Sequence, residues 1–437
     1  MPGHTLIIGG GLAGLMCARE LRSGFTLLEA EERLGGLCRT DQAAGFHFDW
    51  TGHWLHARDP EMRALIEGRW LAGNLVSVQR RAMIYSQETW TRFPYQIHTH
   101  GLPKETVAEC LVEFVKATLG EEGRALRERP LRHAGEFIER HLGKGFDKYF
   151  LRPYNEKLFT IPVEELSPEW GGRFIPKPSL DEVVKGALGL ATEGAGYNAM
   201  FWYPREGGIE SLARGLAGDV RALPGAVRTG ARVERIDLLR KLVRLQSGEE
   251  HRFDDLVLTS PLSSLAKVLA DPPAEVSQAL QALRAVSVTV VEVGAKDVGG
   301  PRFHWAYFPE PRYRFYRIGS PSEVHAALAP PGCRSFALEL SHRGPLDHAA
   351  AIEHSLASLE ELSLIDRSQV LLARARTIPT AYVLFDQAHA AARATVLDHL
   401  ARHGARVAGR YGRWEYSSME DALLSGRDAA RSVRQAR

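Results

Sequence analysis

The sequence predicts an α/β protein in which a parallel βαβ unit is combined with a helical segment and a second β-sheet. Three observations predict it. An apolar strand, a glycine-rich turn and an apolar helix fill residues 4–22, and a second short strand follows at 25–28. Helical periodicity marks residues 105–143. Strand-like segments, rich in valine or alternating, recur between residues 286 and 340 and return at 406–409.

Length and charge limit the functions to consider. The chain has 437 residues, too many for one hydrophobic core, and an ordinary globular composition with 44% hydrophobic and 25% charged residues. Its 55 Lys and Arg nearly balance 53 Asp and Glu, which gives a net charge of +2. Such a balance provides no overall attraction to nucleic acid or to an anionic membrane, so neither is an expected partner.

The cysteines and the apolar runs bear on the compartment. Four cysteines lie far apart without metal-ligand spacing, which predicts reduced thiols and no metal site: Cys17, Cys38, Cys110 and Cys333. The apolar start of the chain lacks the basic flank of a signal peptide and is broken by three glycines. No apolar run reaches the roughly 18 residues that a membrane span needs. We therefore expect a soluble, cytoplasmic protein.

The first βαβ unit carries a dinucleotide-binding fingerprint. Gly9, Gly11 and Gly14 follow the apolar strand and open the helix, with Leu12 and Ala13 between them. The first glycine allows a tight turn, the second lets the backbone approach a pyrophosphate, and the third lets helix and strand pack closely. The N-terminus of the helix then supplies free N–H groups and a positive dipole to the phosphates.

The residues after the second strand extend this site. Glu29 ends that strand, where a ribose hydroxyl would lie, and Arg33 precedes a second glycine turn at Gly36 and Leu37. NAD and FAD both remain candidate ligands on these grounds. The Gly35-Gly36 pair so soon after Glu29, however, resembles the FAD families of the glutathione-reductase superfamily, above all the amine-oxidase and mutase branch.

That resemblance implies non-covalent FAD and a Rossmann-type FAD-binding domain with a helical insertion domain and a second antiparallel or mixed β-sheet domain. It also implies that Val233, Gly409 and Arg410 return to the cofactor late in the chain. Because there is no internal repeat or long linker, the parts should interleave. We expect the FAD domain at 1–75, 205–285 and 405–437, the helical domain at 98–185, and the substrate sheet at 76–97, 186–204 and 286–404.

Several blocks resemble the flavin-dependent UDP-galactopyranose mutases. They are Phe48-Asp-Trp-Thr-Gly-His53, Phe93-Pro-Tyr-Gln96, Leu151-Arg-Pro-Tyr-Asn-Glu-Lys157, Trp170-Gly-Gly-Arg173, Trp305-Ala-Tyr-Phe-Pro-Glu310 and Phe315-Tyr-Arg317. The resemblance implies that His53 lies over the flavin ring and that Arg173 and Arg317 bind a diphosphate. It further implies a set of substrate-binding residues: Phe93, Tyr95, Gln96, Asn155, Phe159, Tyr307, Tyr382 and Tyr416.

The implied activity is ring contraction of a nucleotide sugar, with N5 of reduced FAD as the nucleophile at the anomeric carbon. Two guanidinium groups and several phenols suit a diphosphate, because charge-assisted bonds to its oxygens are strong and directional. The chain departs from the family pattern at Ile318–Ser322 and Ser417–Glu420, so the sugar stays open.

Two alternatives remain. The first is an FAD-dependent oxidase or dehydrogenase acting on an amine or a porphyrinogen, for which Lys296 is a candidate lysine near N5. The second is a nucleotide-sugar binding protein without turnover, which rests on the departures just named. An arginine- and tyrosine-rich pocket favours an anionic substrate over an apolar amine.

Overall fold

The computed structural model describes residues 3–190 and 200–437. Its N-terminal unit is a parallel sheet in the order β19-β13-β1-β2-β9. The central strand β1 is paired in register with β2 on one side and β13 on the other. The strands are β1 (Thr5–Ile8), β2 (Phe25–Leu28), β9 (Ala226–Arg228), β13 (Asp255–Leu258) and β19 (Ala405–Val407). All of them lie within the three segments predicted for the FAD domain.

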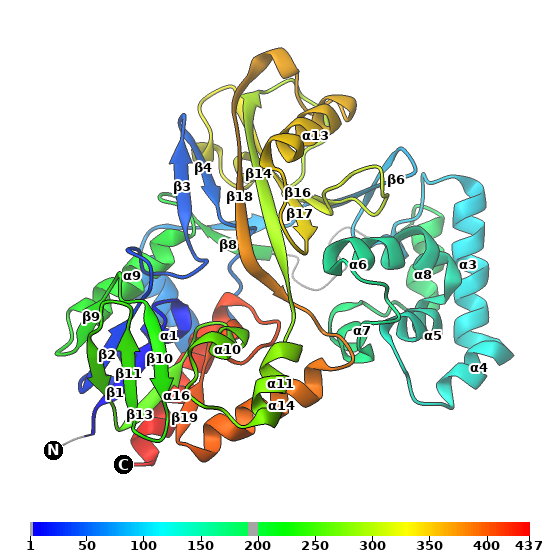
Figure 1. Ribbon diagram of the computed structural model, residues 1–437. Coiled ribbons are helices and arrows are strands. Elements are labelled where there is room, and N and C mark those ends of the chain that lie inside the picture. The colour runs from blue at the N-terminus through cyan, green and yellow to red at the C-terminus, as the bar shows by residue number, and fades with distance from the viewer. Residues whose placement is uncertain (1–2, 191–199) are drawn as a thin grey trace.

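Helices from both ends of the chain meet beside this sheet (Figure 1). α1 (Leu12–Leu21) follows β1, and α16 (Met419–Gln435) ends the chain. The two pack so closely that a Cβ placed on Gly426 of α16 would lie 2.2 Å from the Ala13 carbonyl oxygen. α9 (Glu210–Arg221) and the short α15 (Gly409–Gly412) complete the unit.

A small antiparallel sheet lies beside the parallel one. It consists of β10 (Val233–Asp237), β11 (Leu242–Leu245) and β12 (Glu250–Arg252), and helices α10 (Leu265–Val268), α11 (Ala274–Ala282) and α14 (His389–Arg402) lie on the same side of the molecule. Residues 227–236 alternate in sequence like a single strand, but the structure divides them between β9 and β10 in different sheets. Gly230, with a φ of +64°, lies at the turn between them.

The second large sheet is mixed and has seven strands in the order β18-β14-β17-β16-β15-β6-β7. Its long strand β14 (Ala285–Lys296) lies next to the edge strand β18 and is antiparallel to both neighbours. The other strands are β6 (Ala82–Ser86), β7 (Thr89–Arg92), β15 (Trp305–Tyr307), β16 (Arg317–Gly319), β17 (Cys333–His342) and β18 (Val370–Val383). α13 (His348–Glu361) packs on it, and the 3-10 and short helices η5 (Ala326–Leu328), η6 (Arg367–Gln369) and α12 (Pro321–Val324) connect its strands.

Helices make up most of residues 104–187, on the right of Figure 1. They are α3 (Lys104–Leu119), α4 (Glu121–Arg127), α5 (Ala134–Phe146), η3 (Asp147–Leu151), α6 (Arg152–Phe159), α7 (Pro168–Phe174) and α8 (Leu180–Ala187). Their core is mainly aromatic and aliphatic and includes Phe114, Phe137 and Phe146. None of the helices within the described ranges is long and apolar enough to cross a membrane.

Two short antiparallel pairs of strands connect these parts. β3 (Thr40–Ala43) and β4 (Phe46–Asp49) form a ribbon that rises from the parallel-sheet unit toward β14 and β18 (Figure 1). β5 (Leu75–Gln79) pairs with β8 (Met200–Pro204), next to α2 (Pro60–Leu65) and the π-helix η1 (Ile66–Trp70). The ribbon ends at Asp49, so it places the loop that carries His53 between the two large sheets.

Candidate active site

The turn between β1 and α1 forms a bare backbone surface. Gly9 has a φ of +106°, and a Cβ placed on Gly14 would lie 1.9 Å from the Gly9 carbonyl oxygen. Gly36, with a φ of +61°, approaches so closely that its Cβ would lie 3.2 Å from the Gly11 Cα. No side chain larger than hydrogen fits at Gly14 without movement, and the exposed N–H groups at the start of α1 suit an anion such as a pyrophosphate.

Acidic and basic side chains border this turn. The Glu29 carboxylate is 8% exposed and accepts hydrogen bonds from the backbone N–H groups of Gly10 at 2.7 Å and Glu31 at 2.9 Å. Arg33 donates to Asp41 at 2.8 Å and to Glu210 at 2.5 Å. The hydrogen bond with Asp41 is the main cause that raises the pKa of Arg33. Its charge is therefore already balanced by two carboxylates.

Residues late in the chain reach the same turn. Gly409 has a φ of +76°, and a Cβ there would lie 2.7 Å from the Ala13 Cβ. Arg410 donates to the carbonyl oxygens of Ala381 at 3.2 Å and Ser417 at 3.3 Å, while its buried Nε has no partner among the residues described. The other residues predicted at the cofactor lie in or against the core: Leu12, Ala13, Leu37 and Val233.

His53 follows the β3–β4 ribbon and is partly buried. Its Nδ1 lies 3.1 Å from the Thr51 carbonyl oxygen, which can only accept, and 3.4 Å from the Thr51 hydroxyl. We assign the proton to Nδ1 from the shorter carbonyl contact, so that Nε2 carries the lone pair. Burial lowers the pKa of His53 to about 4, against the raising effect of the Thr51 hydrogen bond. Arg410 and Arg317 lower the pKa further and Glu339 raises it. His53 is therefore within electrostatic reach of both arginines.

This lowered pKa predicts a pH-dependent stability. The unfolded chain binds a proton at His53 below its ordinary pKa of 6.5, whereas the folded chain does so only near 4. The contribution of neutral His53 to the free energy of unfolding is thus intact above pH 6.5 and is lost as the pH falls. The free energy of unfolding should decrease by about 2 kcal/mol between pH 7 and pH 5. In urea unfolding at the two pH values, the His53→Gln variant should lose less stability than the wild type. An equal loss in both proteins would contradict the assigned pKa.

Arg317 and Glu339 form a buried ion pair in the middle of the mixed sheet. Nη2 of Arg317 lies 2.8 Å from each carboxylate oxygen, and Nε lies 3.2 Å from one of them. The side chains are 17% and 3% exposed, and the Tyr316 hydroxyl also donates to Glu339. Burial alone would lower the pKa of Arg317, but Glu339 raises it well above its ordinary value. Arg317 is therefore a fixed cation.

Tyrosines surround the two arginines. The rings of Tyr382 and Tyr416 stack with centroids 6.1 Å apart, and the Arg410 guanidinium lies 5.3 Å and 4.4 Å from their respective centroids. Tyr307 accepts a hydrogen bond from the Trp305 indole at 2.8 Å and contacts the edge of Tyr154. Burial raises the pKa of Tyr382 to about 12, so this hydroxyl keeps its proton at neutral pH and can donate.

Other predicted substrate residues face the protein interior. The buried Asn155 amide donates to the Leu151 carbonyl oxygen at 2.7 Å and accepts from the Trp170 indole at 2.9 Å. The fully buried Tyr95 stacks on Phe150, and Phe159 packs edge to face against Trp170 with centroids 4.6 Å apart. Asn155 and Phe159 thus hold Trp170, whose ring contacts Tyr416 with centroids 5.7 Å apart.

Three predicted residues complete the set. Phe93 contacts Tyr307, with ring centroids 5.1 Å apart, and lies beneath the Arg80 guanidinium. Gln96 is 2% exposed, and its Oε1 has no hydrogen-bond partner in the described part of the chain. Arg173 belongs to helix α7, but its side chain lies outside the described residues.

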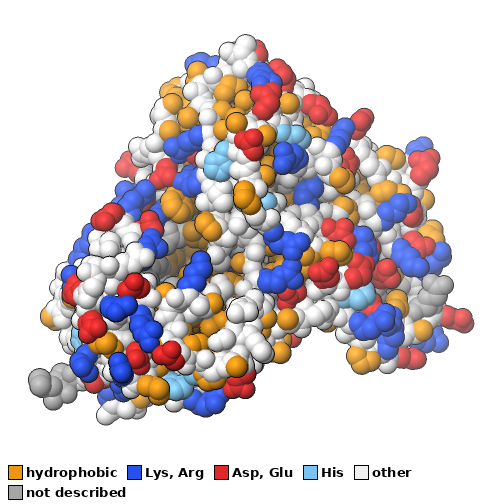
Figure 2. Space-filling view, viewed as in Figure 1, with side chains coloured by type: hydrophobic (Ala, Val, Ile, Leu, Met, Phe, Trp, Pro, Cys, Tyr) orange, Lys and Arg blue, Asp and Glu red, His pale blue; other side chains and the backbone are white. Residues whose placement is uncertain are grey.

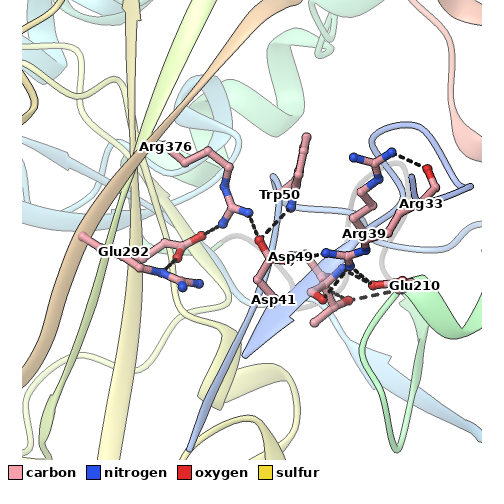
Figure 3. Close-up of polar contacts among 10 residues, drawn as sticks. Arg33, Arg39, Asp41, Asp49, Trp50, Glu210, Glu292 and Arg376 are labelled. Carbon is pink, nitrogen blue, oxygen red and sulfur yellow. Dashed lines mark hydrogen bonds and ion pairs between the residues drawn. The ribbon is translucent and has the colours of Figure 1, made fainter. Parts of the chain in front are cut away.

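The structure also brings forward charged residues that the sequence did not single out. Glu339 is a carboxylate between Leu338 and Leu340 in the apolar middle of β17, and that position was its only signal. Figure 3 shows a second network, in which the Asp41 carboxylate accepts hydrogen bonds from Arg33, Arg376 and the Trp50 indole. Arg376 also donates to Glu292. Figure 2 shows a hollow in the surface between the parallel-sheet unit and the mixed sheet, with Lys and Arg side chains near its edge.

The glycine turn and the late return of Arg410 define a dinucleotide-binding class of protein, and the family comparison specifies a flavin-containing one. The chain matches the model for flavin-containing amine oxidoreductases over residues 12–297, more than half of its length, and it belongs to that family. This confirms the predicted relationship to the amine-oxidase superfamily.

Solved and curated relatives differ in activity. The chain is 23% identical to a protein whose structure is the crystal structure of reduced UDP-galactopyranose mutase, with a TM-score of 0.91 over 100% of this chain and 95% of that one. This similarity confirms the fold class.

Two curated relatives are oxidases. Over 113 residues the chain is 34% identical to coproporphyrinogen III oxidase of Mycobacterium tuberculosis, covering 24% of this chain and 23% of that protein. It is 25% identical to polyamine oxidase 4 of rice (Oryza sativa subsp. japonica) over 280 residues, covering 60% of this chain and 52% of that protein. The matches thus span a quarter to a half of these relatives.

Proposed function

We propose that the protein is an FAD-dependent nucleotide-sugar mutase of the UDP-galactopyranose mutase type. The observation that carries the proposal is the pair of partly buried arginines, Arg317 and Arg410, set among tyrosines and within electrostatic reach of His53. A pocket with fixed cations and phenol donors suits an anionic diphosphate. The full-length similarity in fold to a UDP-galactopyranose mutase supports the same reading.

The residues present fit non-covalent FAD. Gly9, Gly11, Gly14 and Gly36 leave a backbone cradle that a Cβ would fill or distort, and Glu29 lies at its edge for a ribose hydroxyl. The buried Nε of Arg410 is an unused donor that points to a ligand group. Bound and reduced, the flavin would supply the nucleophile for the sugar carbon.

The protein side chains would bind and position the substrate. Arg317 and the tyrosines Tyr307, Tyr382 and Tyr416 would hold the diphosphate, which gains negative charge as it leaves the sugar. Glu339 fixes the orientation of Arg317 through its two carboxylate oxygens. Neutral His53 presents Nε2 as an acceptor, because Nδ1 already donates to Thr51. The unpaired Oε1 of Gln96 would accept from the nucleotide base.

Arg173 provides a separate prediction. If it is the second diphosphate ligand, Arg173→Ala should lower turnover by roughly 10²-fold, because one donor to the developing charge is lost. Steady-state rates of nucleotide-sugar interconversion check this, with exposed Lys177→Ala of the following loop as the control. Unchanged turnover in Arg173→Ala would remove Arg173 from the site.

The reaction itself is tested on the dithionite-reduced protein. Incubation with UDP-galactofuranose should give UDP-galactopyranose, and the oxidised protein should give none. The product is resolved by anion-exchange chromatography. Absence of interconversion by the reduced, flavin-loaded protein would reject the mutase with this substrate pair.

An oxidase of amines or porphyrinogens is the second candidate, favoured by the family match and the curated relatives. Lys296 gives it little support. That residue is exposed and ends β14 opposite Cys333, whereas the other end of β14 pairs with Tyr382. At about 3.3 Å per residue, the length of β14 separates Lys296 from the site. Hydrogen peroxide formed by the oxidised protein with spermine or coproporphyrinogen III would favour the oxidase.

A further inference from the structure

Trp50 lies between two guanidinium groups. The Arg39 and Arg376 guanidinium carbons lie 4.9 Å and 5.0 Å from the centroid of its ring. The indole N–H donates to Asp41 at 3.0 Å, and the backbone N–H of Trp50 donates to the Arg39 carbonyl oxygen at 3.1 Å. We call Arg39, Trp50, Arg376 and Asp41 the tryptophan clasp.

The clasp joins three parts of the molecule (Figure 3). Asp41 also pairs with Arg33, directly before the second glycine turn, at 2.8 Å. Arg376 comes from β18 and pairs with the fully buried Glu292 of β14. A cation–π contact contributes about 0.5–2 kcal/mol, more when it is desolvated. Trp50 is therefore fixed by its backbone, by both faces of its ring and by its N–H.

His53 depends on the residue next to this clasp. The Thr51 carbonyl, one residue after Trp50, accepts from Nδ1 of His53 at 3.1 Å and is the backbone contact that sets the tautomer. Between Thr51 and His53 lies only Gly52, which has no side chain to anchor the loop. The position of that carbonyl is consequently set from the Trp50 side.

We propose that Trp50 is a positioning residue for His53: the tryptophan clasp holds the Thr51 carbonyl, and that carbonyl keeps the imidazole proton on Nδ1. Nε2 then keeps its lone pair and can accept a hydrogen bond from a bound group. The role of His53 toward a ligand rests on the proposed function, whereas its tautomer is independent of that function. Outer contacts of this kind commonly fix the tautomer and orientation of a functional histidine.

The experiment measures the tautomer directly. The flavin-loaded protein is labelled with ¹⁵N-histidine, and the His53 signals among 17 histidines are assigned by their loss in His53→Gln. We expect only the Nδ1–H form in the wild type. Trp50→Ala should give a mixture of both tautomers. Arg376→Met leaves the Trp50 ring in place but removes the guanidinium group from one of its faces, and it should shift the ratio of tautomers in the same direction. Trp50→Phe should restore the Nδ1–H form.

The control is Trp70→Phe. Trp70 has a comparable environment, with one guanidinium group, that of Arg19, 5.6 Å from its ring centroid and its N–H donating to Asp219 at 3.0 Å, but it belongs to η1 and not to the His53 loop. This variant should leave the His53 signals unchanged. A pure Nδ1–H form in both Trp50→Ala and Arg376→Met would overturn the proposal, and so would an equal change in Trp70→Phe.

Turnover separates this proposal from the proposed function. If the wild type interconverts nucleotide sugars, Trp50→Ala should lower kcat by up to about 10²-fold, as expected for a displaced site group, with KM nearly unchanged. A wild type that is inactive on nucleotide sugars would reject the proposed function, whereas the tautomer ratios would still decide the role of the clasp.

Discussion

Replacing Arg317 by alanine is expected to abolish most nucleotide-sugar turnover and to lower the free energy of unfolding by about 3–5 kcal/mol. The loss of stability follows because Glu339, which is 3% exposed, would keep a buried charge without its bidentate partner. The loss of turnover, roughly 10²-fold or more, follows because a fixed cation at the leaving diphosphate disappears. Urea unfolding and steady-state rates measure the two effects.

A second variant distinguishes the two roles of Arg317. In the double variant Arg317→Met/Glu339→Met neither residue of this pair is charged, so most of the stability should return while turnover stays low. Arg302→Ala is the control, since Arg302 pairs with Asp297 and Glu323 but is 40% exposed and should cost at most about 1 kcal/mol. Wild-type turnover in a folded Arg317→Ala protein would remove Arg317 from the active site.

Gly14→Ala is expected to yield a protein that purifies without flavin. The new Cβ would lie 1.9 Å from the Gly9 carbonyl oxygen and 3.3 Å from the Thr259 hydroxyl. The first contact is within the turn itself and the second is with the residue after β13, so α1 must move away from β1 and its N-terminal N–H groups leave the cradle. Overpacking of this kind costs about 1–3 kcal/mol. The ratio of flavin to protein absorbance measures the outcome.

Gly218→Ala is the matched control for that substitution. Gly218 is an exposed helical glycine in α9, and a Cβ there meets no atom within 4 Å. The change should leave the flavin content unchanged and stabilise the protein by about 0.5–1 kcal/mol. A full flavin complement in Gly14→Ala would mean that this turn does not hold the cofactor.

The nucleotide-binding part of the fold could be predicted from the sequence because its signals are local. The strands at Thr5–Ile8 and Phe25–Leu28 lie where their apolar runs and glycines place them. β18 was not anticipated. Its segment is rich in arginine, and it becomes a strand because Arg374 and Arg376 pair with the buried Glu292 on β14. A pairing between residues so distant in sequence leaves no local pattern.

The site was only partly predictable for a similar reason. A motif indicates which residue types are present but not which way each points. The Asn155 amide donates to the Leu151 carbonyl oxygen and accepts from the Trp170 indole, and Tyr95 packs in the helical core. Conversely, Glu339 belongs to no motif in the sequence, and Trp50 lies in the block that ends at His53 without a role predicted for it. Both residues matter through partners that the fold provides.

The close packing of α16 on α1 has a consequence for biosynthesis. Gly426 lies against Ala13, so the helix that presents its N-terminus to the cofactor is covered by the last helix of the chain. The strand β1 likewise gains its neighbour β13 only after the helical segment has been made. During synthesis the N-terminal residues emerge first but lack these partners. Cofactor capture should therefore follow the synthesis of α16, and a nascent chain arrested before residue 419 should not retain flavin.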